Sequence, residues 1–366
     1  MKIKQSRKIK DKISEYFEIM DFNDFMINVL IDPINSDEII FDNYKENKEA
    51  ALDTLEIFQK TNYIMSYDEA LLLNMIAAIV NEEIDLADFP ENVMVEMLSH
   101  GKVFHRGNIE YNPYFKNIKL EEKKYGNLNL CKTFFHKYEL FSYGILNVNG
   151  ILIPQIGTFD YRFSYPCLIK DNAASSVLSP YEMFAMQDFI DKASGKVLIF
   201  GVELGYSAYM VSEKESVKNI TIVEPDSDKI NLFVNEILPQ FPNKEKIEII
   251  QSDVNYLKQV DDNKFDFCFI NSDDILDFDF YVKVKQLCKK FHSMDISYFM
   301  EDTVINMIMP FVFLIILNEY DKDEAELPED DGHVYEYLEN LLKDKEINIP
   351  SDVDFYMNYK NIMDLI

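Results

Sequence analysis

Polar residues and glycines follow four short apolar runs in the second half of the chain. These four sites are Gly201 to Tyr206, Glu224 to Asp226, Gln251 to Val254 and Asn271 to Asp274. Each apolar run is typical of a buried strand in a parallel sheet, and ligands bind such sheets at the carboxyl ends of the strands. Glu224 stands 23 residues after Gly201, where a carboxylate can accept hydrogen bonds from ribose hydroxyls. Together the four sites predict a nucleoside-binding site.

The spacing of the glycines separates two kinds of cofactor. The dinucleotide fingerprint G-x-G-x-x-G would need glycine at 201, 203 and 206, but Glu203 and Tyr206 occupy two of those positions. The G-x-G-x-G spacing that is used for S-adenosylmethionine needs glycine at 201, 203 and 205, and only Glu203 departs from it. S-adenosylmethionine is therefore the expected cofactor, ahead of NAD.

The order of these motifs resembles that of class I S-adenosylmethionine-dependent methyltransferases, close to their spermidine-synthase-like branch. The resemblance covers residues 180 to 300 approximately and rests on KVLIFGVELGYSA, TIVEPD, IIQSDV and FDFCFINSDD. It implies that the glycine loop lies under the methionine moiety, that Glu224 holds the ribose and that Asp253 lies beside the adenine amino group. Asn271 stands where the fourth strand delivers an active-site residue. The expected cofactor-binding residues are Gly201, Glu203, Gly205, Tyr206, Glu224, Pro225, Asp253, Val254 and Asn271.

Two positions depart from the pattern of that family. Ile199 stands where many members carry an acid that reaches the ligand's amino group through water. Glu203 replaces the middle glycine, where a side chain would crowd the ligand and would require a positive φ. Its carboxylate would repel the carboxylate of S-adenosylmethionine, although it could pair with the amino group.

The candidate residues also have structural interpretations. Gly201 and Gly205 could serve only to let a helix pack closely on its strand. Glu224 could cap the helix that follows it, and Asp253 could cap the short helix after the third strand. Both interpretations stay open at the level of sequence.

The residues before the motifs predict two further parts of the chain. Residues 1–100 are predicted to form a helical domain, in which Ser66 to Glu69 make a capping box at the start of an apolar helix. Residues 101–178 alternate with a period of two and are rich in aromatic side chains. Within them, Asn149-Gly150 predicts a β-hairpin, because both residues accept the positive φ of a tight turn.

Residues 179–366 are predicted to form the third part, a doubly wound, Rossmann-like α/β domain. A second capping box at Ser179 to Glu182 opens it, and strands then alternate with helices, which favours a parallel sheet. The expected strands are 196–201, 219–224, 246–251, 265–271 and 296–300. The segment 321–331 is predicted to be a solvated acidic loop.

Composition narrows the classes of function. The chain has 65 acidic and 36 basic residues, a net charge of -29 and three arginines, which argues against nucleic acid as the partner of this acidic protein. The five histidines and four cysteines show no metal-ligand spacing, so no metal site is expected. The most apolar run, Ile308 to Leu317, is too short to span a bilayer, and no secretory signal opens the chain. We expect a cytoplasmic protein; the oligomeric state does not follow from the sequence.

Three functions follow from these observations. The first is methyl transfer from S-adenosylmethionine to a small-molecule or protein acceptor, which needs no particular general base, so no catalytic residue is predicted. The second is aminopropyl transfer to a polyamine, which the acidic chain and Glu203 favour but Leu204 and Asn271 disfavour, because that family carries acids at their positions. The third is a methyltransferase-like module that has lost its reaction through Glu203 and serves in binding or assembly.

Overall fold

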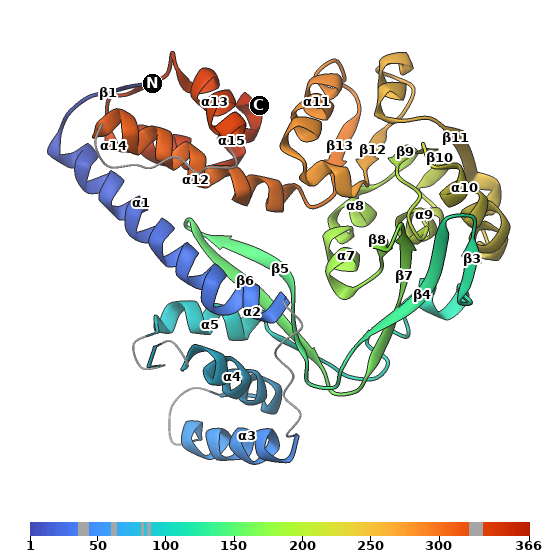
Figure 1. The fold of residues 1–366 in the computed structure, drawn as a ribbon, viewed down its shortest axis with the longest axis horizontal. Helices are drawn as coiled ribbons and strands as arrows, with labels where there is room; N and C mark the ends of the chain where they lie inside the picture. Colours follow the sequence, from blue (N-terminus) through green and yellow to red (C-terminus); the bar gives the residue numbers. More distant parts are fainter. Residues whose placement is uncertain (36–43, 60–63, 82–83, 86–88, 322–331) are drawn as a thin grey trace.

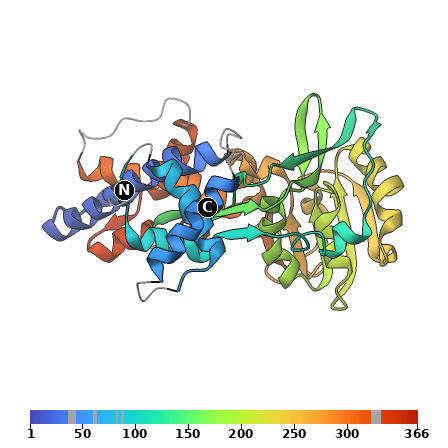
Figure 2. The same ribbon diagram turned by 90° about the horizontal axis from the view of Figure 1, so that it is seen from below.

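The computed structural model describes the chain except for residues 36–43, 60–63, 82–83, 86–88 and 322–331. The described residues form two lobes, and both views show them side by side (Figures 1 and 2). One lobe contains the parallel sheet and its helices. The other contains both chain ends and most of the remaining helices, and the predicted acidic loop at 321–331 falls almost wholly outside the described residues.

A five-stranded, wholly parallel sheet forms the centre of the first lobe, which confirms the predicted α/β class. The order β11-β10-β9-β12-β13 places the first strand of the motif series in the middle. The strands are β9 Gly195–Phe200, β10 Val217–Glu224, β11 Ile247–Gln251, β12 Phe267–Ile270 and β13 Asp295–Tyr298. A parallel sheet with helices on both faces is consistent with a Rossmann-like fold.

Helices cover both faces of this sheet. Successive side chains of a strand point to opposite sides, and those of β9 are buried on both sides. Val197 and Ile199 of β9 pack into one core, and Leu198 and Phe200 pack into another. The helices of the lobe are α7 Pro180–Ala185, α8 Gln187–Lys192, α9 Tyr206–Ser212, α10 Ser227–Leu232 and α11 Phe278–Cys288. The predicted capping box at Ser179 is present and opens α7.

The predicted β-rich segment forms two small sheets, with orders β2-β6-β5 and β3-β4-β7-β8. The predicted hairpin is confirmed: β5 and β6 pair antiparallel, with Asn149 at φ 54° and Gly150 at φ 92° in the turn. The strands are β2 Lys102–Phe104, β3 Lys123–Tyr125, β4 Leu128–Phe135, β5 Leu140–Val148, β6 Ile151–Phe159, β7 Phe163–Lys170 and β8 Ala173–Val177. A short helix, α6 Pro113–Asn117, precedes β3.

The described residues among the first hundred are mainly helical, as predicted, and Ser66 makes the predicted capping box with Glu69. Their helices are α1 Arg7–Met26, α2 Asp32–Asn35, α3 Tyr44–Phe58, α4 Tyr67–Val80 and α5 Glu91–His100. The C-terminal elements are α12 Glu301–Tyr320, α13 Gly332–Leu342, β14 Glu346–Ile347, α14 Pro350–Tyr356 and α15 Tyr359–Leu365. Strand β1 Lys2–Ile3 pairs with β14, and α1 contacts α12 and α14, so the two ends of the chain pack together. The division of the chain at residues 100 and 178 stays a prediction.

Among the helices of the described residues, α12 is long and apolar enough to cross a bilayer, with a mean hydropathy of 1.6. It contains the apolar run from Ile308 to Leu317, which is therefore helical, with Pro310 inside the helix. Its residues Val304, Ile308 and Val312 are buried in a core that also contains Ile9 and Ile13 of α1.

Candidate functional site

The carboxyl ends of β9, β10, β11 and β12 surround a cavity of about 430 Å³, here called the strand-end pocket. Six of the nine residues that the sequence predicted for cofactor binding line it: Gly201, Glu203, Glu224, Pro225, Asp253 and Val254. The parallel register explains this gathering, because each of the four motifs begins where its strand ends. The predicted motifs therefore meet at one edge of the sheet.

Both glycines of the first loop are required by the backbone. Gly201 has a φ of 90°, and a Cβ atom there would overlap the carbonyl oxygen of Asn271. Gly205 has a φ of 75°, and a Cβ atom would lie 2.7 Å from the ring of Phe233. Close packing of the loop against β12 and against the helix after β10 thus accounts for both residues, whether or not a ligand binds.

Glu203 adopts the positive φ that its position in the loop predicted, 44°. The carboxylate accepts a hydrogen bond from the Ser176 hydroxyl and pairs with the Lys229 ammonium at 3.2 Å. The side chains of Glu203 and Lys229 are 20% and 13% exposed, so this ion pair is largely shielded from solvent. A negative charge is consequently fixed inside the strand-end pocket, where the sequence pattern would have had glycine.

Glu224 is 3% exposed and holds two loops together. The Val202 N–H donates to its Oε2 at 3.0 Å, and the Asp226 N–H donates to its Oε1 at 2.8 Å. A carboxylate has about four lone-pair sites, so two remain for other donors. The side chain is therefore fixed in place and keeps acceptor capacity beside the pocket.

The N-cap of α10 is Asp226, so the interpretation of Glu224 as that cap is wrong. The Asp228 N–H donates to Asp226 Oδ1 at 2.7 Å, and the Lys170 ammonium donates to Oδ2 at 2.5 Å. Burial raises the pKa of the Asp226 carboxyl, but the bonds from Lys170 and from the backbone outweigh it and hold the pKa below its usual value. Lys170 thereby ties β7 to the start of α10.

Asp253 is the N-cap of the short 3-10 helix Val254–Gln259, as its structural interpretation predicted. Its carboxylate accepts from the Asn255 side chain at 3.0 Å and from the Asn255 N–H at 2.9 Å, and these bonds lower the pKa of Asp253. Because Asp253 also lines the strand-end pocket, capping and ligand binding are compatible.

Three predicted residues lie outside the lining of the strand-end pocket as far as the described residues define it. Gly205 is at the start of α9, and Tyr206 is buried with its hydroxyl accepting from the Asn112 side chain at 3.0 Å. Asn271 is buried and donates to the Ser207 hydroxyl at 3.4 Å. It lines a neighbouring cavity of about 70 Å³, which Glu203 also lines.

Sequence reasoning missed the lysines and the strand that complete the pocket. Lys170, Lys229 and Lys283 line it, together with Ser175 of β8. The Lys229 ammonium also donates to the Ser175 carbonyl at 3.2 Å, so β8 is joined to α10 across the pocket. The run AASSV of β8 carries no motif that could have indicated this position.

No group of three or more His, Cys, Asp or Glu side chains that could hold a metal ion occurs in the described part of the chain. The four cysteines are unpaired thiols. The charges of the strand-end pocket thus come from its carboxylates and lysines.

No family model matches the chain, and no curated protein matches it. Among solved structures, it is similar to a spermidine synthase in complex with the transition-state analogue AdoDATO, with 16% identity over 44% of this chain and 59% of that one, at a TM-score of 0.30. It is also similar to spermidine synthase from Thermotoga maritima, with 18% identity over 44% and 60% of the two chains, at a TM-score of 0.30.

The chain thus spans about three fifths of the length of these two enzymes. A TM-score of 0.30 is too low for either structure to support a statement about activity. The conclusion that stands is a mixed α/β chain with a Rossmann-like parallel sheet and a charged pocket at the carboxyl ends of its strands.

Proposed function

We propose that the strand-end pocket binds an adenosyl sulfonium compound of the S-adenosylmethionine type and that the chain transfers an alkyl group from it to an acceptor. The observation that carries this proposal is Glu224. Its carboxylate is held by two backbone amides at the carboxyl end of β10, and its remaining lone pairs can accept from both ribose hydroxyls. Asp253, at the end of the next strand, provides an acceptor for the adenine amino group.

Such a reaction depends mainly on the positioning of the acceptor relative to the donor. The sulfonium is already an activated leaving group, so the protein must align the acceptor with the transferred carbon and exclude water. The small cavity beside Asn271 adjoins the strand-end pocket through Glu203 and offers a place for the acceptor. Phe299 and Met186 form apolar parts of its wall.

Glu203 favours a donor without a carboxylate, which makes aminopropyl transfer the second candidate. Its fixed negative charge repels the carboxylate of S-adenosylmethionine and attracts the ammonium that both donors carry. Decarboxylated S-adenosylmethionine keeps the ammonium and lacks the carboxylate. Against this candidate, Leu204 and Asn271 stand where the aminopropyltransferase pattern has acids.

The ion pair between Glu203 and Lys229 favours a third candidate, a module that binds without catalysis. The pair already satisfies both charges inside the pocket, and a ligand tail has to displace or bypass it. Tight donor binding by the unmodified protein would exclude this candidate.

Calorimetric titration of the full chain with each sulfonium donor separates the three candidates. Methyl transfer predicts that S-adenosylmethionine binds at least as tightly as its decarboxylated form. Aminopropyl transfer predicts the reverse order. No heat from either donor at millimolar concentration would overturn the proposal of group transfer.

A further inference from the structure

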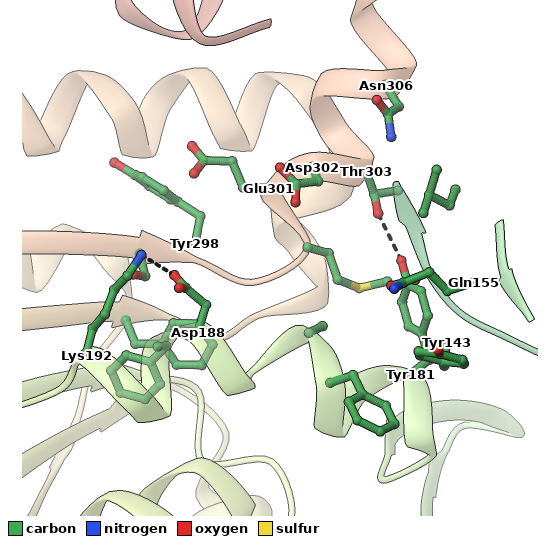
Figure 3. Close-up of a pocket in the computed structure, with 18 of the residues that line it drawn as sticks. Tyr143, Gln155, Tyr181, Asp188, Lys192, Tyr298, Glu301, Asp302, Thr303 and Asn306 are labelled. Carbon is green, nitrogen blue, oxygen red and sulfur yellow. Dashed lines mark hydrogen bonds and ion pairs between the residues drawn. The ribbon is translucent and has the colours of Figure 1, made fainter. Parts of the chain in front are cut away.

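A second cavity of about 430 Å³ lies between the parallel sheet and the β5–β6 hairpin (Figure 3). We call it the edge cavity. Tyr143 and Gln155 reach it from the hairpin, Asp188 from α8, Tyr298 from β13 and Asp302 from α12. Among the described residues, it shares no lining residue with the strand-end pocket.

One wall of the edge cavity is the outermost strand of the sheet. In the part of the chain that the structure describes, β13 pairs with β12 and has no strand on its other side. Three of its residues, Ile296, Ser297 and Tyr298, line the cavity. The cavity therefore lies along an open sheet edge.

The hydrogen bonds of β13 show which backbone groups face outward. The N–H groups of Asp295 and Phe299 donate to carbonyls on the β12 side, at 3.1 and 2.9 Å. In a parallel pair, alternate residues of a strand bond to the same neighbour. Ile296 and Tyr298 accordingly direct their N–H and C=O groups away from β12. Open edges of this kind pair readily with extended peptide segments.

The charge of the edge cavity is negative. Asp188, Glu301 and Asp302 line it against one lysine, Lys192, whose ammonium lies 2.6 Å from Asp188. Among the described residues, the Asp302 carboxylate accepts no hydrogen bond and forms no close ion pair, although the charge of Lys360 lowers its pKa. Burial raises the pKa values of Glu301 and Asp302, and the neighbouring charge of Asp188 raises that of Asp302 further.

Two of the three acids already have partners: Asp188 pairs with Lys192, and Glu301 has a structural role. Glu301 accepts from the Tyr281 hydroxyl at 2.9 Å and lies 3.6 Å from the Lys285 ammonium. Glu301 and Asp302 also stand in the first turn of α12, where negative charge stabilises a helix. Asp188 belongs to another helix and pairs with Lys192; its charge raises the pKa of Asp302, and the charge of Lys360 lowers it.

We propose that β13 and the edge cavity bind an extended segment of a partner protein, with a lysine or arginine side chain placed between Asp188 and Asp302. A peptide uses both features of the site, because its backbone pairs with the open edge and its basic side chain meets the carboxylates. A free amine would leave the edge unpaired. A second copy of this chain, paired through its own β13, would bring three carboxylates against three others.

Short peptides test this proposal on the full chain. The probe is an acetylated, amidated pentapeptide of β-branched residues with one central lysine, labelled for fluorescence anisotropy. We expect a Kd below about 1 mM at low salt. A central glutamate should abolish binding, and N-methylation of the two amides that flank the lysine should weaken it about tenfold, because it removes the pairing with β13.

Asp302→Asn is the matching variant of the protein, because it removes the charge and keeps the shape. It should weaken the lysine peptide about three- to tenfold, whereas Glu215→Gln, at an exposed site outside the lining of the edge cavity, should leave affinity unchanged. Equal affinity for the N-methylated peptide would overturn the proposal, as would binding of spermidine as tight as that of the peptide. Dimerisation of the chain that the peptide does not reverse, or an absence of binding, would overturn it as well.

Discussion

Glu203 and Lys229 form an ion pair at 3.2 Å inside the strand-end pocket, and the Ser176 hydroxyl holds the same carboxylate from β8. The contact joins the loop after β9, the helix after β10 and the strand that covers the pocket. It fixes a carboxylate, paired with an ammonium, in the place where the tail of a sulfonium donor is proposed to lie. Under the proposed function, the choice of donor should therefore depend on Glu203.

Glu203→Gly should tighten the binding of S-adenosylmethionine about tenfold, because it removes the repelling carboxylate and frees Lys229 for the carboxylate of the ligand. It also relieves a positive φ that costs roughly 1 kcal/mol for a residue with a side chain. Titration calorimetry measures the affinity. Glu203→Gln is the matched control, since it removes the charge and keeps the bulk. An unchanged affinity in both variants would contradict the role given to this charge.

Glu224→Ala should lower both the stability of the protein and its affinity for a nucleoside. Glu224 is buried and accepts from two backbone amides, so its removal affects the fold as well as the pocket. Leaving those amides without a partner should cost about 1–3 kcal/mol of unfolding free energy. Thermal and urea unfolding measure this cost. A variant with wild-type stability would show that the loops do not depend on the carboxylate.

Gly201→Ala should destabilise the protein by about 2–4 kcal/mol, because the new methyl group would overlap the carbonyl of Asn271 at a φ of 90°. Gly332→Ala is the control, since a Cβ atom at Gly332 meets nothing within 4 Å and its φ needs no glycine. Urea unfolding of both variants measures the difference. Similar midpoints would contradict the tight contact between the first loop and β12.

His105 should make stability depend on pH. Its ring lies 2.8 Å from Asp160 and 3.0 Å from Asp68, and the bonds to these two carboxylates raise its pKa above 6.5. A group with a raised pKa stabilises the fold fully below its unfolded value, and this contribution is lost as the pH rises through the folded value. The ring is 52% exposed, so the contribution is less than about 1 kcal/mol.

The test compares the melting temperature of the wild type and of His105→Gln from pH 6 to pH 9. The melting temperature of the wild type should exceed that of the variant at pH 6, and the difference should shrink as the pH rises. A constant difference between the two proteins would show that the protonated ring contributes nothing.

The elements of the first lobe could be predicted because their signals are local. A strand that is buried on both faces is apolar at every position, as VLIF of β9 is, and the capping box at Ser179 needs only four residues. The gathering of the strand-end residues then follows from the parallel order. Gly201 could be singled out for the same reason, since a loop that turns sharply after a strand needs it.

The contacts between distant segments could not be predicted in the same way. Lys229 and Ser176 lie 26 and 27 residues from Glu203, and nothing in their neighbourhood indicates that they meet. Tyr206 was placed in the site because of its position in the motif, but the first turn of α9 directs it to Asn112. The pairing of β1 with β14 could not be predicted from the sequence either, because each strand has only two residues.

The binding of a nucleoside is the central claim, and titration with 5′-methylthioadenosine tests it most directly. This probe has the adenosine and the sulfur but no amino-acid tail, so Glu203 and Lys229 do not affect the result. The wild type should bind it, and Glu224→Gln, which keeps one acceptor oxygen and loses the charge, should bind about tenfold more weakly. Absence of binding at millimolar concentration, or equal binding by a correctly folded Glu224→Gln variant, would contradict the account.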